Sequence, residues 1–310
     1  MRLVFFGTPE FAVPSLRALV EEGFDVAAVV TQPDKPKGRH HGHLLPPPIK
    51  VEALEEHLPV LQPTRPNEQE FLDQLRELQP NLGVVVGYGH ILKPALLEVP
   101  PEGMINVHAS LLPLFRGAAP IEYAILNGLE ETGVSVMQLD AGMDTGPVLH
   151  QVTTPIALDE NAGELTARLA ELGALALIEA LSLIATGTAE SVPQDDSLAS
   201  YARKLTPEMA RINWDNPAET IARLVRALDP RVGARTTLHG RMVKLFGPRP
   251  ADKWDERERP GEIIETTPAL VVATGTGALQ FLDVQPEGRP RMAAADWIRG
   301  RGATKGDCFE

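Results

Sequence analysis

A single cysteine, Cys308, is present among the 310 residues. One thiol excludes an intrachain disulfide framework and any multi-cysteine metal site, and it fits a reducing compartment. Long apolar runs are lacking at the amino terminus as well. Residues 3–6 are apolar, but Gly7-Thr8-Pro9 interrupts them at once, and such a run is too short for a signal peptide or a membrane span. We therefore expect a cytoplasmic protein that does not engage a membrane.

Positive charge is also in short supply. The chain carries 29 Lys and Arg against 42 Asp and Glu, a formal net charge of −13, whereas generic nucleic-acid binding relies on clustered basic side chains. The deficit is uneven, with 13 basic and 27 acidic residues in 1–205 but 16 and 15 in 206–310. This asymmetry permits an anionic partner at the carboxy-terminal part, although a solvated charged surface is the simpler interpretation.

A dinucleotide-binding fingerprint is absent from the first strand and turn. Residues 5–9 read FFGTP, without the spacing G-x-G-x-x-G, and Pro9 removes an N–H donor where a pyrophosphate would sit. The sequence therefore predicts no dinucleotide site.

Apolar runs of strand length recur along the first half of the chain. They cover residues 3–6, 26–30, 82–86, 104–107 and 134–139, and helical patterns such as 68–78 and 120–127 lie between them. Continuous rather than alternating apolar strands indicate a sheet that is covered on both faces. We predict an α/β domain with a doubly wound, Rossmann-like, mostly parallel sheet, whose active site lies at the carboxyl ends of the strands.

The pattern changes in the second half. A long helix is predicted at about 162–185, and the polar stretch that follows, with Pro193 and Pro207, is typical of a linker. Short strands and turns after it predict a smaller β-rich, OB-like barrel domain. The predicted division is a catalytic domain at 1–189, a linker at 190–207 and a carboxy-terminal domain at 208–310.

The segment INVHASLLPLFRG, residues 105–117, places two polar side chains in an apolar run. In a strand, Asn106 and His108 share one face while Ile105 and Val107 enter the core. A carboxamide can donate to a developing oxyanion and an imidazole can donate a hydrogen bond or move a proton, which suits addition to a carbonyl. The alternative is that both side chains only satisfy backbone groups at a strand end.

The loop LDAGMDTGP, residues 139–147, holds two carboxylates among glycines. An aspartate beside His108 would fix the orientation of the ring and favour its charged form, and Asp144 is the predicted partner. Asp140 either caps the turn or faces a bound ligand. Both aspartates could also be ordinary turn residues, and spacing alone does not separate these roles.

These two segments resemble the methionyl-tRNA formyltransferases, as do the opening FFGTPEFAVPSL, the loop TQPDKPKGR and the later YARKLTPEMARINW. The resemblance runs from about residue 2 into the carboxy-terminal domain. N-x-H-x-SLLP with a downstream Asp loop is typical of folate-dependent formyl transfer in general. TQPD-x-P-x-GR together with the extra domain narrows the resemblance to enzymes that act on tRNA.

The resemblance implies transfer of the formyl group of 10-formyltetrahydrofolate to the methionine α-amino group of initiator methionyl-tRNA, for translation initiation. It implies that Asn106, His108 and Asp144 are the catalytic residues. The implied folate-binding residues are Ser110, Leu111, Leu112, Pro113, Val86, Tyr88, Gly89 and Asp140. The implied tRNA contacts are Lys35, Lys37 and Arg39, and the carboxy-terminal domain is expected to bind tRNA. We expect a monomer.

One loop departs from the family pattern. After TQPDKPKGR the family continues with a small basic stretch, whereas this chain has His40, His41 and His43. Such an exposed loop lacks carboxylate or cysteine support for a transition metal, so no metal is predicted.

Two other functions remain open at the level of the sequence. One is a folate-dependent formyltransferase that acts on a small amine, and the other is a catalytically silent protein that binds RNA or folate. The GR-bearing loop and the extra domain argue against the first, and the intact set of Asn106, His108 and Asp144 argues against the second.

Overall fold

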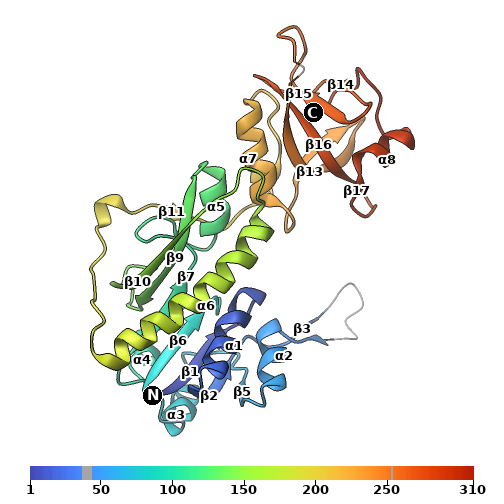
Figure 1. Cartoon of the computed structure of the whole chain (residues 1–310). Helices are drawn as coiled ribbons and strands as arrows, with labels where there is room; N and C mark the ends of the chain where they lie inside the picture. The colour runs from blue at the N-terminus through green and yellow to red at the C-terminus, as the bar shows by residue number, and fades with distance from the viewer. Residues whose placement is uncertain (37–43, 253) are drawn as a thin grey trace. The chain divides into compact units, whose positions relative to one another are not determined.

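The computed structural model describes residues 1–36, 44–252 and 254–310 (Figure 1). Contacts divide the chain into two compact units. The first unit comprises Met1–Pro120, Glu131–Thr154 and Thr166–Ala202, and the second comprises Ile121–Glu130, Pro155–Leu165 and Arg203–Glu310. Two short segments of the predicted catalytic domain, Ile121–Glu130 and Pro155–Leu165, thus belong to the second unit. The predicted domain and linker boundaries, at 189 and 207, stay a prediction.

A seven-stranded sheet forms the centre of the first unit, in the order β10-β9-β7-β6-β1-β2-β5. Its strands are β1 (Arg2–Gly7), β2 (Asp25–Val30), β5 (Val60–Leu61), β6 (Leu82–Val86), β7 (Met104–His108), β9 (Glu131–Gln138) and β10 (Val148–Pro155). The pairs β2–β5, β1–β2, β1–β6 and β6–β7 are parallel, whereas β9 runs antiparallel to β7. The predicted mostly parallel, Rossmann-like sheet is confirmed.

Helices cover this sheet because its central strands are apolar on both faces. The helices of this part of the chain are α1 (Val13–Glu21), α2 (Pro48–Glu55), α3 (Gln69–Glu77), α4 (Pro94–Leu97) and most of α6 (Ala162–Thr186). Amphipathic α3 buries Phe71, Leu72 and Leu75 in a core cluster with Val4 and Phe6 of β1. That burial removes apolar surface on both elements from water and is the main stabilising term.

Helix α6 is long and apolar enough, by length and composition alone, to cross a membrane. In the structure 44% of its most apolar window is buried inside the protein, including Leu169, Leu177 and Leu181. A Cβ added to Gly173 would lie 3.0 Å from Val107 Cγ1, so this glycine lets α6 approach β7 closely. These contacts are typical of the core helix of a globular domain.

The second unit is built on an antiparallel sheet with the strand order β12-β13-β16-β15-β14. Its elements are α5 (Pro120–Leu126), α7 (Ala218–Leu228), β12 (Ala234–Leu238), β13 (Arg241–Ala251), β14 (Ile263–Glu265), β15 (Leu270–Ala273), β16 (Ala278–Pro286), β17 (Met292–Ala293) and α8 (Ala294–Arg299). The sheet forms a half-barrel, which confirms the prediction of a smaller β-rich domain. Trp214 lies in its core, stacked on Phe309 with ring centroids 5.6 Å apart.

Candidate active site

Strand β7 carries the two polar side chains that the sequence singles out. Asn106 and His108 are only 8% and 6% exposed. Their neighbour Val107 faces α6, so the period-2 alternation of a strand turns Asn106 and His108 to the other face of the sheet, as predicted. Within the described parts of the chain, the Asn106 carboxamide makes no side-chain hydrogen bond. Its amide atoms are not fully enclosed by protein, so the amide donors are available to a ligand.

Both ring nitrogens of His108 face hydrogen-bond acceptors. Nε2 donates to the Phe115 carbonyl oxygen at 3.0 Å, and because a carbonyl only accepts, this nitrogen carries a hydrogen. Nδ1 lies 3.7 Å from Asp144 Oδ2, within ion-pair range but longer than a hydrogen bond. The structure therefore brings together His108 and Asp144, the pair that the sequence predicts.

The contact between Asp144 and His108 depends on a strand pairing and a loop direction that the sequence does not reveal. Because β9 is antiparallel to β7, Gln138 at its carboxyl end pairs with Ile105, near the start of β7, while His108 pairs with Ser135. The loop 139–147 then returns to bring Asp144 beside the ring. Gly117 N donates to Asp144 Oδ2 at 2.8 Å and holds the carboxylate there.

Asp140 caps this loop. Its Oδ1 accepts hydrogen bonds from Gly142 N at 2.9 Å and from Thr145 Oγ1 at 2.7 Å. Of the two roles left open by the sequence, these contacts are those of a turn-capping residue. Its other carboxylate oxygen has no hydrogen bond within the described residues, and contact with folate stays a prediction.

The segment after β7 is fixed by a buried hydroxyl of β9. Ser135 Oγ donates to the Ser110 carbonyl at 2.6 Å and accepts from Leu112 N at 3.0 Å. Gln151 of β10 adds bonds from its Nε2 to Ser135 Oγ at 2.8 Å and to the Leu112 carbonyl at 2.9 Å. The conformation of this predicted folate-binding segment is thus determined by two neighbouring strands.

The side chains of that segment are not equally available to a ligand. Ser110 is buried and its Oγ donates to the Leu114 carbonyl at 2.5 Å, and Leu112 is buried too. Leu111 and Pro113 are half-buried. A ligand here would therefore contact the side chains of Leu111 and Pro113.

The other predicted folate-binding segment, 84–92, buries the side chains of Val86 and Tyr88, whereas Ile91 is 82% exposed. Val86 is fully buried and Tyr88 is only 1% exposed, with its ring against Phe6 at a centroid distance of 5.3 Å. The Tyr88 hydroxyl has no hydrogen-bond partner among the residues that the structure describes, and burial raises its pKa to about 12. Gly89 is exposed with a φ of +80°. This segment therefore offers a ligand the backbone around Gly89 rather than the side chains of Val86 and Tyr88.

Part of the predicted tRNA loop can be located. Lys35 is exposed in β3 (Lys35–Pro36), which pairs with β4 (Leu44–Leu45), and its Nζ donates to Gln32 Oε1 at 2.8 Å. Beside it, hydrogen bonds from Gln62 and Lys50 lower the pKa of Asp34. The other predicted members of the loop lie outside the described residues: Lys37, Arg39, His40, His41 and His43.

Metal-ligating side chains do not gather in the described ranges. No group of three or more His, Cys, Asp or Glu residues in 1–36, 44–252 and 254–310 could hold a metal ion.

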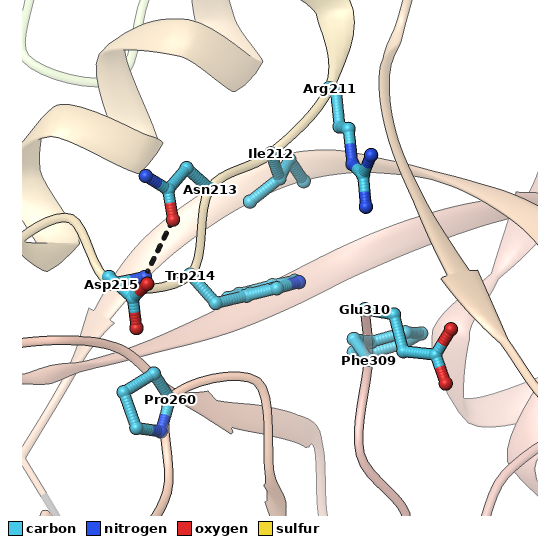
Figure 2. Close-up of a pocket in the computed structure, with 8 residues that line it drawn as sticks. All are labelled: Arg211, Ile212, Asn213, Trp214, Asp215, Pro260, Phe309 and Glu310. Atoms are coloured by element: carbon cyan, nitrogen blue, oxygen red, sulfur yellow. Dashed lines mark hydrogen bonds between the residues drawn. The ribbon is translucent and has the colours of Figure 1, made fainter.

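The second unit contains a cavity of about 390 Å³ beside Trp214 (Figure 2). Charged and amide side chains are among the residues that line it, including Arg211, Asn213 and Asp215. Asn213 Oδ1 accepts from Asp215 N at 3.1 Å, and the Trp214 indole donates to Thr236 Oγ1 at 3.0 Å. The residues that line this cavity include no histidine, so it lacks the imidazole–carboxylate pair found at His108.

Known protein families match both the amino-terminal and the carboxy-terminal part of the chain. A family model described as "Formyl transferase" matches residues 1–181, and one described as "Formyl transferase, C-terminal domain" matches residues 204–302. The methionyl-tRNA formyltransferase of Moorella thermoacetica is 47% identical over 301 residues, which cover 97% of this chain and 96% of that protein. The chain belongs to the methionyl-tRNA formyltransferase family. Another relative with this name, from Geobacter metallireducens, is 46% identical with the same coverage.

Solved structures support the fold of this methionyl-tRNA formyltransferase family member. An N-formyltransferase from Helicobacter canadensis, in complex with folinic acid and dTDP-3-aminofucose, superimposes with a TM-score of 0.70. It covers 92% of this chain and 99% of its own, at 20% identity. The family resemblance that the motifs indicate is therefore confirmed, whereas the roles of individual residues stay predictions.

Sequence reasoning missed several residues that support His108 and Asp144. The Phe115 carbonyl, Gly117 N and the side chains of Ser135 and Gln194 all contact the site. Their contributions are backbone groups or bonds between distant segments, so no local pattern marks them. A local sign of these long-range contacts is Arg116, a charged residue in the middle of a largely apolar segment.

Proposed function

We propose that this chain transfers the formyl group of 10-formyltetrahydrofolate to the α-amino group of methionine on initiator methionyl-tRNA. The product is N-formylmethionyl-tRNA, used in translation initiation. The observation that carries the proposal is the arrangement of Asn106, His108 and Asp144 in a chain 47% identical to a methionyl-tRNA formyltransferase. A small-amine substrate is not favoured, because the relatives at 46–47% identity over 97% of the chain are named methionyl-tRNA formyltransferase, whereas the N-formyltransferase bound to dTDP-3-aminofucose is only 20% identical.

The reaction needs positioning and support for an oxyanion more than activation of the nucleophile. A free α-amino group has a reference pKa of about 7.7, so part of it is neutral at physiological pH. Its nitrogen attacks the formyl carbon and forms a tetrahedral intermediate with negative charge on the former carbonyl oxygen. The free N–H groups of Asn106 donate to this oxygen, and a protonated His108 adds positive charge, with Asp144 as its negative partner.

Collapse of the intermediate completes the transfer. The bond between the formyl carbon and N10 of folate breaks, the attacking nitrogen loses a proton, and the folate nitrogen gains one. Either His108 or a water molecule carries this proton. The covalent change thus ends with an amide on methionine and free tetrahydrofolate.

The remaining partners follow from the same family membership. We assign folate contacts to Leu111, Pro113 and the backbone at Gly89. Lys35, Lys37 and Arg39 are assigned to tRNA phosphates, and the carboxy-terminal domain provides a further RNA contact. The enzyme acts as a cytoplasmic monomer and needs no metal.

A transfer assay with two acceptors tests this function. Labelled 10-formyltetrahydrofolate is incubated with the protein and either charged initiator tRNA or glycinamide ribonucleotide, and label is expected only on the tRNA. Asn106→Ala should lower turnover by roughly 10² to 10³, because it removes the oxyanion donor. Asn127→Ala, at an exposed position, serves as the matched control. Transfer to the small amine alone would refute the proposal, and an Asn106→Ala enzyme of nearly normal turnover would refute the oxyanion role.

A further inference from the structure

The two groups that face His108 are both carried by residues with unusual backbone conformations. Phe115, whose carbonyl accepts from Nε2, has a φ of +57°, and Asp144, whose carboxylate faces Nδ1, has a φ of +54°. Residues other than glycine rarely occupy this left-handed region, and a bulky one such as phenylalanine does so least often. Such conformations persist where the surrounding structure holds them.

The holding contacts come from one stretch of the predicted linker. Ser200 Oγ accepts from Phe115 N at 2.9 Å, and the Ser200 carbonyl accepts from Arg116 N at 2.8 Å. Gln194 Nε2 donates to the Asp144 carbonyl at 2.9 Å and to the Gly146 carbonyl at 2.7 Å. Each partner of His108 is therefore bonded to a residue between 194 and 200, some fifty or more positions further along the chain.

Arg116 determines which way the Gln194 amide points. Its guanidinium is only 2% exposed, and Nε and Nη2 both donate to Gln194 Oε1, at 3.0 and 2.9 Å. Nη2 also donates to Asp196 Oδ1 at 2.8 Å. A buried guanidinium offers only donors, so the amide oxygen must face it and the amide NH₂ must face the two carbonyls of the Asp144 loop.

We infer that Gln194 is a positioning residue for formyl transfer: its amide, oriented by Arg116, holds the loop 139–147 in the conformation that places Asp144 beside His108. This inference rests on the proposed roles of Asp144 and His108. Its bonds to the loop are to the carbonyls of Asp144 and Gly146, and the folate contacts assigned to Leu111, Pro113 and Gly89 lie outside this loop, so Gln194 should affect the chemical step rather than the binding of either substrate.

Two substitutions of Gln194 separate positioning from simple packing. Gln194→Met keeps the length of the side chain but loses both hydrogen bonds to the loop. Gln194→Glu keeps an oxygen for Arg116, and strengthens that contact with a charge, but turns an acceptor toward the carbonyls of Asp144 and Gly146. If Gln194 mattered only as a partner for Arg116, the Glu variant would work normally.

We expect kcat to fall roughly 10- to 100-fold in both variants, with the KM values for folate and tRNA nearly unchanged. Gln74→Met, at an exposed position of α3, is the matched control and should leave kcat unaltered. Circular dichroism of each variant checks that it is folded. A Gln194→Glu enzyme with normal kcat would overturn the inference.

Combination with Asp144→Asn distinguishes failure of the inference from failure of the proposed function. Asp144→Asn alone should be severe, and adding Gln194→Met to it should cost little more, because both act through the same carboxylate. Full activity of Asp144→Asn would refute the catalytic role of Asp144. A severe Asp144→Asn with an unimpaired Gln194→Met, or with fully additive losses, would refute the positioning role of Gln194.

Discussion

Replacing Tyr88 by Phe should make the protein more stable. The Tyr88 hydroxyl is buried and has no hydrogen-bond partner in the described part of the chain, and burying such a group costs about 1–3 kcal/mol. Phe keeps the ring and its contact with Phe6 but removes the unsatisfied oxygen. The small void that remains offsets part of the gain, so we expect the free energy of unfolding to rise by about 1 kcal/mol or more.

The pH dependence of this gain has a definite sign. Burial raises the pKa of Tyr88 from its ordinary value of 10.0 to about 12. As the pH passes 10, the hydroxyl therefore ionises in the unfolded chain but not in the folded protein, and the parent loses stability that the Phe variant keeps. The advantage of Tyr88→Phe should widen by about 0.8 kcal/mol between about pH 8 and pH 10.5.

Urea unfolding of the two proteins at both pH values measures the effect. The three tryptophans, Trp214, Trp254 and Trp297, all belong to the second unit, so unfolding around Tyr88 is better followed by far-ultraviolet circular dichroism. The two proteins share every other titrating group, and the difference between them isolates Tyr88. A less stable Phe variant at pH 8, or an advantage that stays constant as the pH rises, would refute this account.

Two further predictions concern other positions of the first unit. Gly117→Ala should lower the free energy of unfolding by roughly 2 kcal/mol or more and reduce turnover, because φ is +116° and the new Cβ would lie 2.8 Å from the Ala202 carbonyl oxygen. Gly23→Ala, also at positive φ but in open space, should cost only about 1 kcal/mol in the same urea titration, and equal losses at both sites would contradict the steric argument. Hydrogen bonds from Gln62 and then from Lys50 lower the pKa of Asp34 in the folded protein. Ionised Asp34 therefore stabilises the folded state at pH values above its unfolded pKa of about 3.9. This contribution is lost as the pH falls through the lower pKa of the folded state. Asp34→Asn should therefore flatten the acid limb of stability below about pH 4, and an unchanged limb would show that Asp34 does not contribute to it.

The sequence predicts those parts of the site that follow from local periodicity. The apolar and polar residues of β7 alternate, and this places Asn106 and His108 on one face without knowledge of any other element. The sequence is a poorer predictor of helices that bury polar residues. Helix α2 is not predicted from its pattern, because the acidic residue Glu52 interrupts the apolar positions; in the structure Glu52 is buried and accepts hydrogen bonds from Arg17 at 2.8 and 2.9 Å.

Long-range pairing explains the rest of what sequence reasoning missed. Its chemistry and the family resemblance predict Asp144 as the partner of His108, whereas nothing local shows that β9 is antiparallel and that its loop returns to His108. Gln194 belongs to a polar, proline-containing stretch that resembles a solvated linker. Its importance appears only when Arg116, 78 residues earlier, is seen against it. Tyr88 likewise appears as a ligand contact in the motif, whereas its side chain lies in the core.

The bonds made by residues 192–202 also determine where foreign sequence can be inserted. Val192 forms a bridge with Val148, and Tyr201–Ala202 pairs with Arg116–Gly117. Residues added between these two points would therefore displace Gln194 or Ser200 from its hydrogen-bond partners. Glu190 lies just before them, is exposed, and makes no hydrogen bond within the described chain. A fluorescent label or an affinity tag placed at Glu190 should therefore leave the enzyme active, whereas the same insertion after Pro193 should not.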